Sequence, residues 1–233
     1  MSLLKVENLV SYIGLFTILH GINMEIQAGE AVGILGRNGA GKTTFLRTVM
    51  GLVKTRSGVI ELDGQSLVGK PPHKISQMGI ALCPEDYGVF DELSISENLA
   101  LAKHKDDTAT QDRITYVLDL FPDLKLAYKR PARTLSGGQR QMLSVGRSLV
   151  NETQLILIDE PSKGLAPIVI EKMALALKEI SKKSTILLVE QNFNMALAVT
   201  DRYYIIDEGR TVHNGIMQEL ANDKELQHRH LGL

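Results

Sequence analysis

One octapeptide constrains the fold of this chain more than any other segment. Residues 36–43 read Gly-Arg-Asn-Gly-Ala-Gly-Lys-Thr, which fits the pattern G-x-x-x-x-G-K-[ST], and they follow an apolar run and open a helical pattern. Glycines let the backbone curl so that successive N–H groups point inward, and the positive end of the following helix faces the same point. The segment therefore predicts a phosphate-binding loop between a strand and a helix, in preference to an ordinary glycine-rich turn.

Each residue type in this loop suits a nucleotide triphosphate with its metal ion. Lys42 would place a full positive charge on the β- and γ-phosphates, and the Thr43 hydroxyl would bind Mg²⁺, which prefers oxygen ligands. The expected ligands are thus ATP and Mg²⁺. The predicted nucleotide-binding residues of the loop are Gly36, Arg37, Asn38, Gly39, Ala40, Gly41, Lys42, Thr43 and Thr44.

Apolar periodicity around the loop predicts an α/β fold. Ile170, Met173, Leu177 and Ile180 recur with the 3.6-residue period of a helix that buries one face, between two apolar runs that read as strands. This pattern is typical of a βαβ unit. Residues 207–210, Asp-Glu-Gly-Arg, suit the turn of a hairpin. Strands are predicted at residues 5–10, 22–26, 31–35, 58–62, 155–158, 185–189, 203–206 and 211–213.

The middle of the chain has a different pattern from its two ends. From about residue 93 to residue 150 the periodicity is helical, and it begins at a candidate capping box in which Ser94 precedes Glu97 by three residues. We therefore expect a single domain over residues 1–233. Its core would comprise about residues 1–84 and 153–233, with a helical subdomain inserted at about residues 85–152.

Two carboxylates follow the apolar run 155–158. Asp159 and Glu160 would lie at the carboxyl end of a buried strand, where ligands bind in open α/β sheets. Asp159 would hold Mg²⁺ through its water shell, and Glu160 would position or activate the attacking water as a general base. Alone, this pair before Pro161 could equally be a surface turn. Together with the phosphate-binding loop, it favours a site for ATP hydrolysis.

A second glycine-containing segment precedes the acidic pair. Leu135, Ser136, Gly137, Gly138 and Gln139 form a sequence that, alone, would be a Gly-Gly loop capped by serine, but it can also form a second anion cradle of backbone N–H groups. With the two motifs above and in this order, it resembles the LSGGQ signature of ATP-binding-cassette (ABC) ATPases. The resemblance implies a RecA-like P-loop NTPase core, an antiparallel β subdomain and an inserted helical subdomain. It also implies a head-to-tail pair of subunits in which these five residues contact ATP in trans.

Further segments resemble one subgroup of that family, the LivF-like ATP-binding subunits of importers for branched-chain and other hydrophobic amino acids. They include Pro84-Glu85, residues 160–167 (Glu-Pro-Ser-Lys-Gly-Leu-Ala-Pro), residues 188–192 (Leu-Val-Glu-Gln-Asn) and residues 230–233 (His-Leu-Gly-Leu). The resemblance covers nearly the whole chain. It implies that branched-chain amino acids are the cargo, although importers of urea, short amides or other hydrophobic amino acids have similar cassettes.

The same resemblance implies a location and partners. The protein would be a cytoplasmic ATPase, peripheral on the inner face of the cell membrane. Its partners would be a second ABC subunit, either a sister cassette or an identical copy, two membrane permease subunits and, indirectly, an extracytoplasmic solute-binding protein. Nucleic acid is not an expected partner.

Some positions depart from the family pattern. Glu85 stands where most members have a glutamine that reaches Mg²⁺ and the attacking water, and Gln191 replaces a histidine that contacts the γ-phosphate. Both are expected to be catalytic, and Gln191 to slow hydrolysis because its amide cannot become cationic. Tyr87, with Phe90, either contacts the membrane subunit or folds back on its own subdomain.

The aromatic side chain that stacks on adenine in the family is the least defined feature. Tyr12 is the candidate nearest to the family position, and Phe16 is the alternative. The six histidines show no zinc-ligand spacing, and His228 and His230 are expected to be solvent-exposed in a polar tail.

Composition and charge disfavour some alternative functions. Lys and Arg number 26 against 27 Asp and Glu, so no global field attracts nucleic acid, which disfavours the non-transport ABC ATPases. A metabolite kinase of the P-loop type would leave the second anion cradle unexplained. Cys83 is the only cysteine, which excludes an internal disulfide and suits a reducing compartment, and we expect it to be buried. The apolar runs are far shorter than a membrane span, and no secretory signal is expected.

Overall fold

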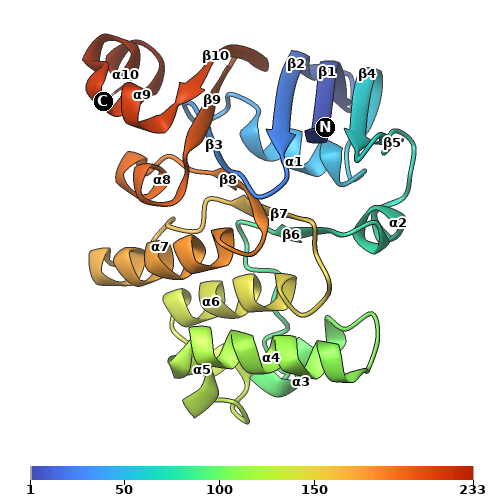
Figure 1. The fold of residues 1–233 in the computed structure, drawn as a ribbon, viewed down its shortest axis with the longest axis vertical. Helices are drawn as coiled ribbons and strands as arrows, with labels where there is room; N and C mark the ends of the chain where they lie inside the picture. Colours follow the sequence, from blue (N-terminus) through green and yellow to red (C-terminus); the bar gives the residue numbers. More distant parts are fainter. Residues whose placement is uncertain (1, 233) are drawn as a thin grey trace.

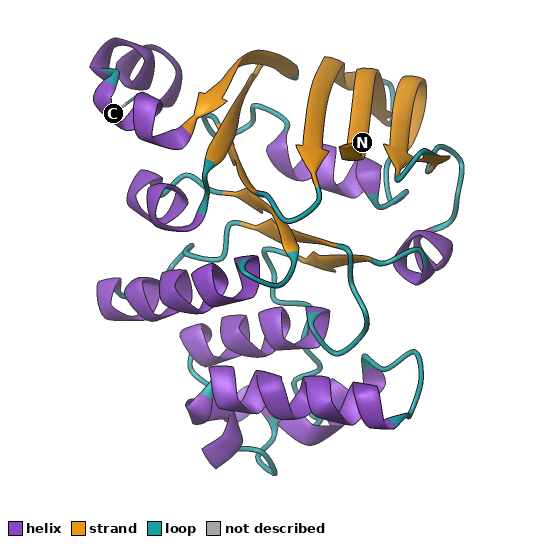
Figure 2. Cartoon of the chain, viewed as in Figure 1, coloured by secondary structure: helices purple, strands orange, loops and turns teal. Residues whose placement is uncertain are grey.

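Two β-sheets organise the protein in the computed structural model, which describes residues 2–232 (Figure 2). The strands are β1 (Ser2–Ile13), β2 (Phe16–Gln27), β3 (Ala31–Leu35), β4 (Lys54–Leu62), β5 (Gln65–Ser66), β6 (Ile80–Cys83), β7 (Leu155–Asp159), β8 (Thr185–Val189), β9 (Arg202–Asp207) and β10 (Arg210–Ile216). The α-helices are α1 (Lys42–Val49), α2 (Pro72–Gln77), α3 (Ile95–Leu101), α4 (Thr108–Leu120), α5 (Pro122–Leu126), α6 (Gly137–Ser148), α7 (Pro167–Ser181), α8 (Phe193–Val199), α9 (Met217–Asn222) and α10 (Lys224–Leu231). A 3₁₀ turn, Ala132–Thr134, precedes α6.

The six-stranded sheet carries the site. Its strand order is β10-β9-β3-β8-β7-β6, and all neighbouring pairs are parallel except β10 with β9. Every residue of β3, β7 and β8 is buried, as expected for a parallel sheet covered on both faces. Along β7, Leu155 and Leu157 pack into one apolar cluster while Ile156 and Ile158 pack into the other. The parallel sheet is therefore the wall between two cores.

The four-stranded antiparallel sheet covers one side of that wall. Its order is β2-β1-β4-β5, and its inner face packs with α1 in the cluster that contains Leu4, Ile22, Phe45 and Leu46 (Figure 1). Along β2, the apolar residues Leu19, Ile22, Met24 and Ile26 are buried, with exposed or half-exposed neighbours between them. This alternation is the one that a half-buried strand requires.

The helices α3 to α6 form the opposite end of the molecule (Figure 1). Their apolar side chains, among them Leu99, Ile114, Val117 and Leu143, join the second cluster together with α7. The predicted capping box starts α3: the Glu97 N–H donates to Ser94 Oγ at 3.2 Å, and the Ser94 N–H donates to a Glu97 carboxylate oxygen at 2.7 Å. The fold class expected from the sequence, an α/β P-loop core with an antiparallel sheet and inserted helices, is confirmed.

The predicted strands are all present, but several are longer than predicted, and some short elements were not predicted. The first hairpin is much longer than expected, since β1 and β2 each have 12 residues and turn only at Gly14-Leu15. Helix α2 and strand β6 had no usable sequence signal, because β6 has only four residues and no alternation. In α7, the predicted face is confirmed for Met173, Leu177 and Ile180, which are buried.

The carboxyl-terminal helix corrects one expectation. His228 is exposed as predicted, but His230 is half-buried and its Nδ1 lies 3.4 Å from an Asp207 carboxylate oxygen. The prediction failed because α10 folds back toward the end of β9, a long-range contact that the polar tail sequence does not indicate. Cys83 is buried as expected, and burial raises the pKa of its thiol to about 12. Among residues 2–232, no helix is both long and apolar enough to cross a membrane.

The pairing of β1 with β4 is interrupted by a bulge that depends on Gly58. The register passes from Glu7 opposite Val59 to Val10 opposite Ser57. Gly58 has φ +104°, and a Cβ there would lie 2.6 Å from the Asn8 carbonyl oxygen. Only glycine fits this backbone.

Gly58→Ala should therefore lower the free energy of unfolding by about 3 kcal/mol or more, because it combines a disallowed φ with a clash against backbone. Gly64→Ala is the matched control, since Gly64 has φ +72° and a Cβ there would meet no atom within 4 Å, and it should cost about 1 kcal/mol. Urea unfolding of both variants measures the difference. Equal losses would contradict the bulge argument.

Candidate functional site

The loop between β3 and α1 has the curled backbone that its glycines predict. Gly36, Gly39 and Gly41 all have positive φ, at 145°, 79° and 106°. At Gly36, a Cβ would lie 2.1 Å from the Ile206 carbonyl oxygen, so the start of the loop is pressed against β9. The amino end of α1 opens at Lys42, which directs its unpaired N–H groups into the loop. The loop can hold an anion.

Lys42 is buried inside this loop. Its ammonium donates to the carbonyl oxygens of Gly36 and Arg37 at 2.8 and 3.1 Å. It lies 3.7 Å from Glu160 Oε1, and its side chain is only 4% exposed. Burial lowers the pKa of Lys42, while the neighbouring carboxylates of Glu160 and Asp159 act to raise it. The Lys42 ammonium, which lies beside two carboxylates, could therefore bind another anion in their place.

Asp159 ends β7 and faces the first turn of α1. The Thr43 hydroxyl donates to Asp159 Oδ1 at 3.1 Å, so a hydroxyl and a carboxylate meet at the carboxyl edge of the sheet. Asp159 is 3% exposed. Burial is the largest cause that raises its pKa, to about 6; the Thr43 hydroxyl lowers it, and Glu160 and Glu85 raise it further.

Glu160 follows immediately in a strained conformation. Its φ is +46°, a left-handed value that few residues other than glycine adopt, and its N–H donates to the Val189 carbonyl oxygen at 2.9 Å. The Gln191 amide donates to Glu160 Oε1 at 2.7 Å and also to Asn38 in the phosphate-binding loop. Gln191 therefore links the segment after β8, the acidic pair and the loop.

Glu85 comes from a third strand end, because it follows β6. Its carboxylate pairs with the Lys163 ammonium, which also lies 3.8 Å from Glu160 Oε2. A cavity of about 240 Å³ opens between these groups, the loop and β2. Its lining residues are Ile18, Asn38, Gly39, Gly41, Lys42, Thr43, Thr44, Glu85, Glu160 and Lys163.

The second glycine segment lies elsewhere, at the start of α6. None of its residues lines that cavity. Ser136 caps the helix: its Oγ accepts from the Gln139 N–H at 3.3 Å, and its own N–H donates to Gln139 Oε1 at 3.1 Å. Ser136 and Gly137 are exposed, whereas Gly138 is buried, and a Cβ at Gly138 would lie 2.4 Å from Val169 Cγ1 of α7. The exposed helix start faces outward, available to another molecule.

The two aromatic candidates of the first hairpin do not line the cavity. Tyr12 is half-buried on β1, and Phe16 is 76% exposed where β2 begins. Ile18 is the residue of β2 that does line it. The choice between Tyr12 and Phe16 stays a prediction.

Glu190 is a site residue that the sequence analysis missed. It is 1% exposed and follows β8 directly, and its carboxylate accepts from the N–H and the hydroxyl of Ser162, each at 2.9 Å. The N–H groups of Gln191 and Asn192 donate to it as well, at 3.1 and 3.0 Å. Glu190 thus binds the segment after β7 to the segment after β8. A glutamate directly after an apolar strand, as in the acidic pair, was the available signal.

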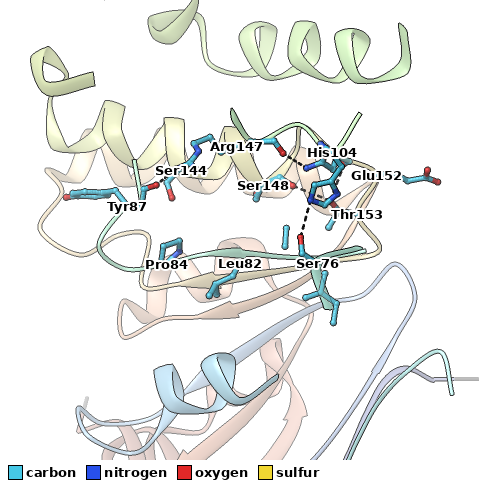
Figure 3. A pocket seen from close by; sticks show the side chains of 15 residues that line it. Ser76, Leu82, Pro84, Tyr87, His104, Ser144, Arg147, Ser148, Glu152 and Thr153 are labelled. Carbon is cyan, nitrogen blue, oxygen red and sulfur yellow. Dashed lines mark hydrogen bonds between the residues drawn. The ribbon is translucent and has the colours of Figure 1, made fainter. Parts of the chain in front are cut away.

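A second cavity, of about 270 Å³, lies between β6 and α6 (Figure 3). We call it the groove; Tyr87, Gly88, His104, Ser144 and Arg147 are among its lining residues. The Arg147 guanidinium donates to the Gly88 carbonyl oxygen and lies 5.0 Å from the centre of the Phe90 ring. Its Nε is the one buried side-chain nitrogen or oxygen without a hydrogen-bond partner in the described part of the chain.

Comparisons with known proteins fit this geometry. Residues 19–163 match the family model described as ABC transporter. The chain is 39% identical to BraG of Pseudomonas aeruginosa, a high-affinity branched-chain amino acid transport ATP-binding protein, over 99% of this chain and all of BraG. It is 37% identical to LivF of Archaeoglobus fulgidus, a probable branched-chain amino acid transport ATP-binding protein, over 93% of each. A lipopolysaccharide export ATP-binding protein of Haemophilus influenzae, LptB, is 30% identical over 100% of this chain and 98% of its own.

Solved structures agree on the fold. The ADP conformation of an ATP-binding cassette from an ABC transporter superposes with a TM-score of 0.82 at 25% identity, covering 97% of this chain and 96% of that one. The cbiO1 protein of Clostridium perfringens, part of the ABC transporter complex cbiONQ, gives a TM-score of 0.82 at 27% identity, covering 98% and 94%.

Asp159→Asn should stabilise the protein in the absence of ligand. The carboxyl pKa is raised from 3.8 to about 6 on folding, so stability is lost as the pH rises through that interval. A shift of about two units corresponds to about 3 kcal/mol, and asparagine should recover about 1–2 kcal/mol of it at neutral pH while still accepting from Thr43.

Urea unfolding at about pH 7 and about pH 4 measures the effect, which should shrink at the lower pH. Asp112→Asn, at an exposed position, is the control. A destabilised Asp159→Asn protein at neutral pH would show that the contacts of the charged carboxylate outweigh the cost of its burial.

Proposed function

The chain belongs to the ABC transporter family and is an ATPase, and from this premise we propose that it energises the import of branched-chain amino acids. The observation that carries the proposal is the match, over nearly the full length of both chains, with two proteins named for branched-chain amino acid transport. The lipopolysaccharide export relative is less similar. Importers of urea, amides or other hydrophobic amino acids are the alternative, because a cassette does not touch the cargo.

We propose roles for the phosphate-binding residues from their contacts. The backbone N–H groups of residues 36–44 and the Lys42 ammonium would bind the phosphates of ATP, and Lys42 would exchange its contact with Glu160 for the γ-phosphate. Glu160 would accept the proton of the attacking water. Gln191, which donates to Glu160 Oε1, would hold that carboxylate in position without adding positive charge. Tyr12, or Phe16, would stack on adenine.

The residues present fit a Mg²⁺ ion that accompanies ATP. Thr43 and Asp159 bring a hydroxyl and a carboxylate together, and Glu85 contributes another carboxylate nearby. No group of three or more His, Cys, Asp or Glu residues suited to a metal occurs among residues 2–232. Such a sparse oxygen donor set suits Mg²⁺, which takes its remaining ligands from phosphates and water. When bound, the ion would neutralise charge on the β- and γ-phosphates.

A second subunit would complete the site. Leu135, Ser136, Gly137, Gly138 and Gln139 lie away from this chain's own cavity, and the exposed amino end of α6 is suited to the γ-phosphate held by another subunit. We propose a head-to-tail pair, with either an identical copy or a sister cassette. Its two sites would be unequal if the sister carried a histidine in place of Gln191.

We propose that the groove receives a cytoplasmic segment of one membrane permease subunit. The transporter would have two such subunits, each in contact with one cassette. Arg147 Nε is buried there without a partner, and Phe90 is half-exposed beside it, so a segment with an acceptor group and an apolar side chain would satisfy both. The protein would thereby be cytoplasmic and peripheral on the inner face of the membrane. A solute-binding protein would act on the opposite side, through the permeases.

Glu160→Gln should bind ATP but hydrolyse it at least about a hundredfold more slowly, because the amide cannot accept the proton of water. The measurement is phosphate release together with retained nucleotide after gel filtration. Glu171→Gln, an exposed change on α7, is the control. Turnover equal to that of the wild type would remove Glu160 from the role of base.

Affinity purification of the tagged protein from its native membranes in mild detergent, followed by mass spectrometry, tests the importer. Two polytopic permeases and a second cassette are the expected partners. Arg147→Met should reduce permease recovery at least about fivefold, because docking then leaves the partner's acceptor unpaired. Arg56→Met, on the exposed antiparallel sheet, is the matched control.

Recovery of ribosomes or nucleic acid in place of permeases would overturn the importer. Full permease recovery by Arg147→Met, with its ATP binding and thermal stability intact, would overturn the groove as the docking site.

A further inference from the structure

The cavity beside the phosphate-binding loop is lined by both acidic and basic side chains. Glu85 and Glu160 line it, and Asp159 accepts a hydrogen bond from Thr43, which also lines it. ATP would bring its own negative charges into the same space, so carboxylates without compensation would repel it. Two cations face these acids, Lys42 and Lys163.

Lys42 cannot balance Glu85. Its ammonium is held by two carbonyl oxygens inside the phosphate-binding loop, and its carboxylate contact is with Glu160 Oε1 at 3.7 Å. Its positive charge is committed to the phosphate side of the cavity. Another cation must therefore compensate the negative charge of Glu85.

Lys163 stands at the required position. It lies three residues after Glu160, in a turn where the Lys163 N–H donates to the Glu160 carbonyl oxygen at 3.1 Å. The ammonium pairs with Glu85 Oε1 and lies 3.8 Å from Glu160 Oε2, so it bridges the loop after β6 and the loop after β7. Gln191 and Lys42 contact the other oxygen of Glu160. The two oxygens of the proposed base therefore have different neighbours.

We propose that Lys163 is a positioning residue that neutralises Glu85 and so keeps the cavity able to accept the phosphates of ATP. The two side chains act as one neutral unit beside the phosphate-binding loop. The inference rests on the ATP site proposed above. It adds that Glu85 needs Lys163, whereas glutamine at position 85 would not.

A double-mutant cycle tests this dependence. Four proteins are compared: the wild type, Lys163→Met, Glu85→Gln and the variant with both changes. Calorimetry measures the affinity for ATP in EDTA, and for a non-hydrolysable ATP analogue with Mg²⁺. Lys163 is 60% exposed, so its effect is screened and a change of about three- to fivefold is expected at low salt.

The expected result is that Lys163→Met weakens ATP binding in the protein with Glu85 and leaves the affinity of the Glu85→Gln protein unchanged. The loss should be larger in EDTA than with Mg²⁺, should diminish at high salt, and should be absent in Lys163→Arg, which keeps the charge. Lys125→Met is the matched control, because Lys125 is 61% exposed and pairs with Asp119 far from the cavity.

Equal weakening in the wild-type and Glu85→Gln backgrounds would overturn the proposal, because Lys163 would then act on ATP or on Glu160 directly. Unchanged affinity in both backgrounds would overturn it too. The cycle measures binding, whereas the role of Glu160 is tested by hydrolysis, so the two ideas can fail separately.

Discussion

The buried ammonium of Lys42 is the interaction on which the site depends. By donating to the carbonyl oxygens of Gly36 and Arg37, it satisfies acceptors that the curled loop turns inward. The loop can take this path because Gly36 tolerates both a positive φ and contact with the backbone of β9. A charged side chain in such a place is stable only beside a counter-charge, which Glu160 supplies.

Parallel strand order brings the remaining groups together. The neighbouring strands β6, β7 and β8 end at one edge of the sheet and deliver Glu85, then Asp159 with Glu160, then Gln191. Burying so many acids in one place costs stability, as the raised pKa of Asp159 indicates. Four hydrogen bonds to Glu190 offset part of this cost, and the two that Ser162 donates join the loop after β7 to the loop after β8. The strained φ of Glu160 belongs to the same arrangement, since its side chain lines the cavity.

The sequence predicted what depends on local pattern. The loop, the fully buried strands β3, β7 and β8 and the Ser94 capping box could all be identified because each signal lies within a few consecutive residues. The contacts of Lys163 with Glu85 could not, since 78 residues separate the partners and neither has a distinctive neighbourhood. The burial of His230 was missed for the same reason. The serine cap expected as one interpretation of residues 135–139 is present, because Ser136 and Gln139 form a capping box at the start of α6.

The tip of the β9–β10 hairpin, at Gly209, ties two other segments together. Its N–H donates to the Ala40 carbonyl oxygen and its carbonyl oxygen accepts from the His20 N–H, at 2.9 and 2.8 Å. These two bonds join β2, the phosphate-binding loop and the β9–β10 hairpin, so the three should travel as one rigid body. The loops carrying Glu85 and Lys163 are linked at the cavity by a solvent-exposed ion pair. The side of the cavity formed by β2 and the phosphate-binding loop should therefore be stiffer than the side formed by Glu85 and Lys163, so that an entering nucleotide would displace the second side more than the first.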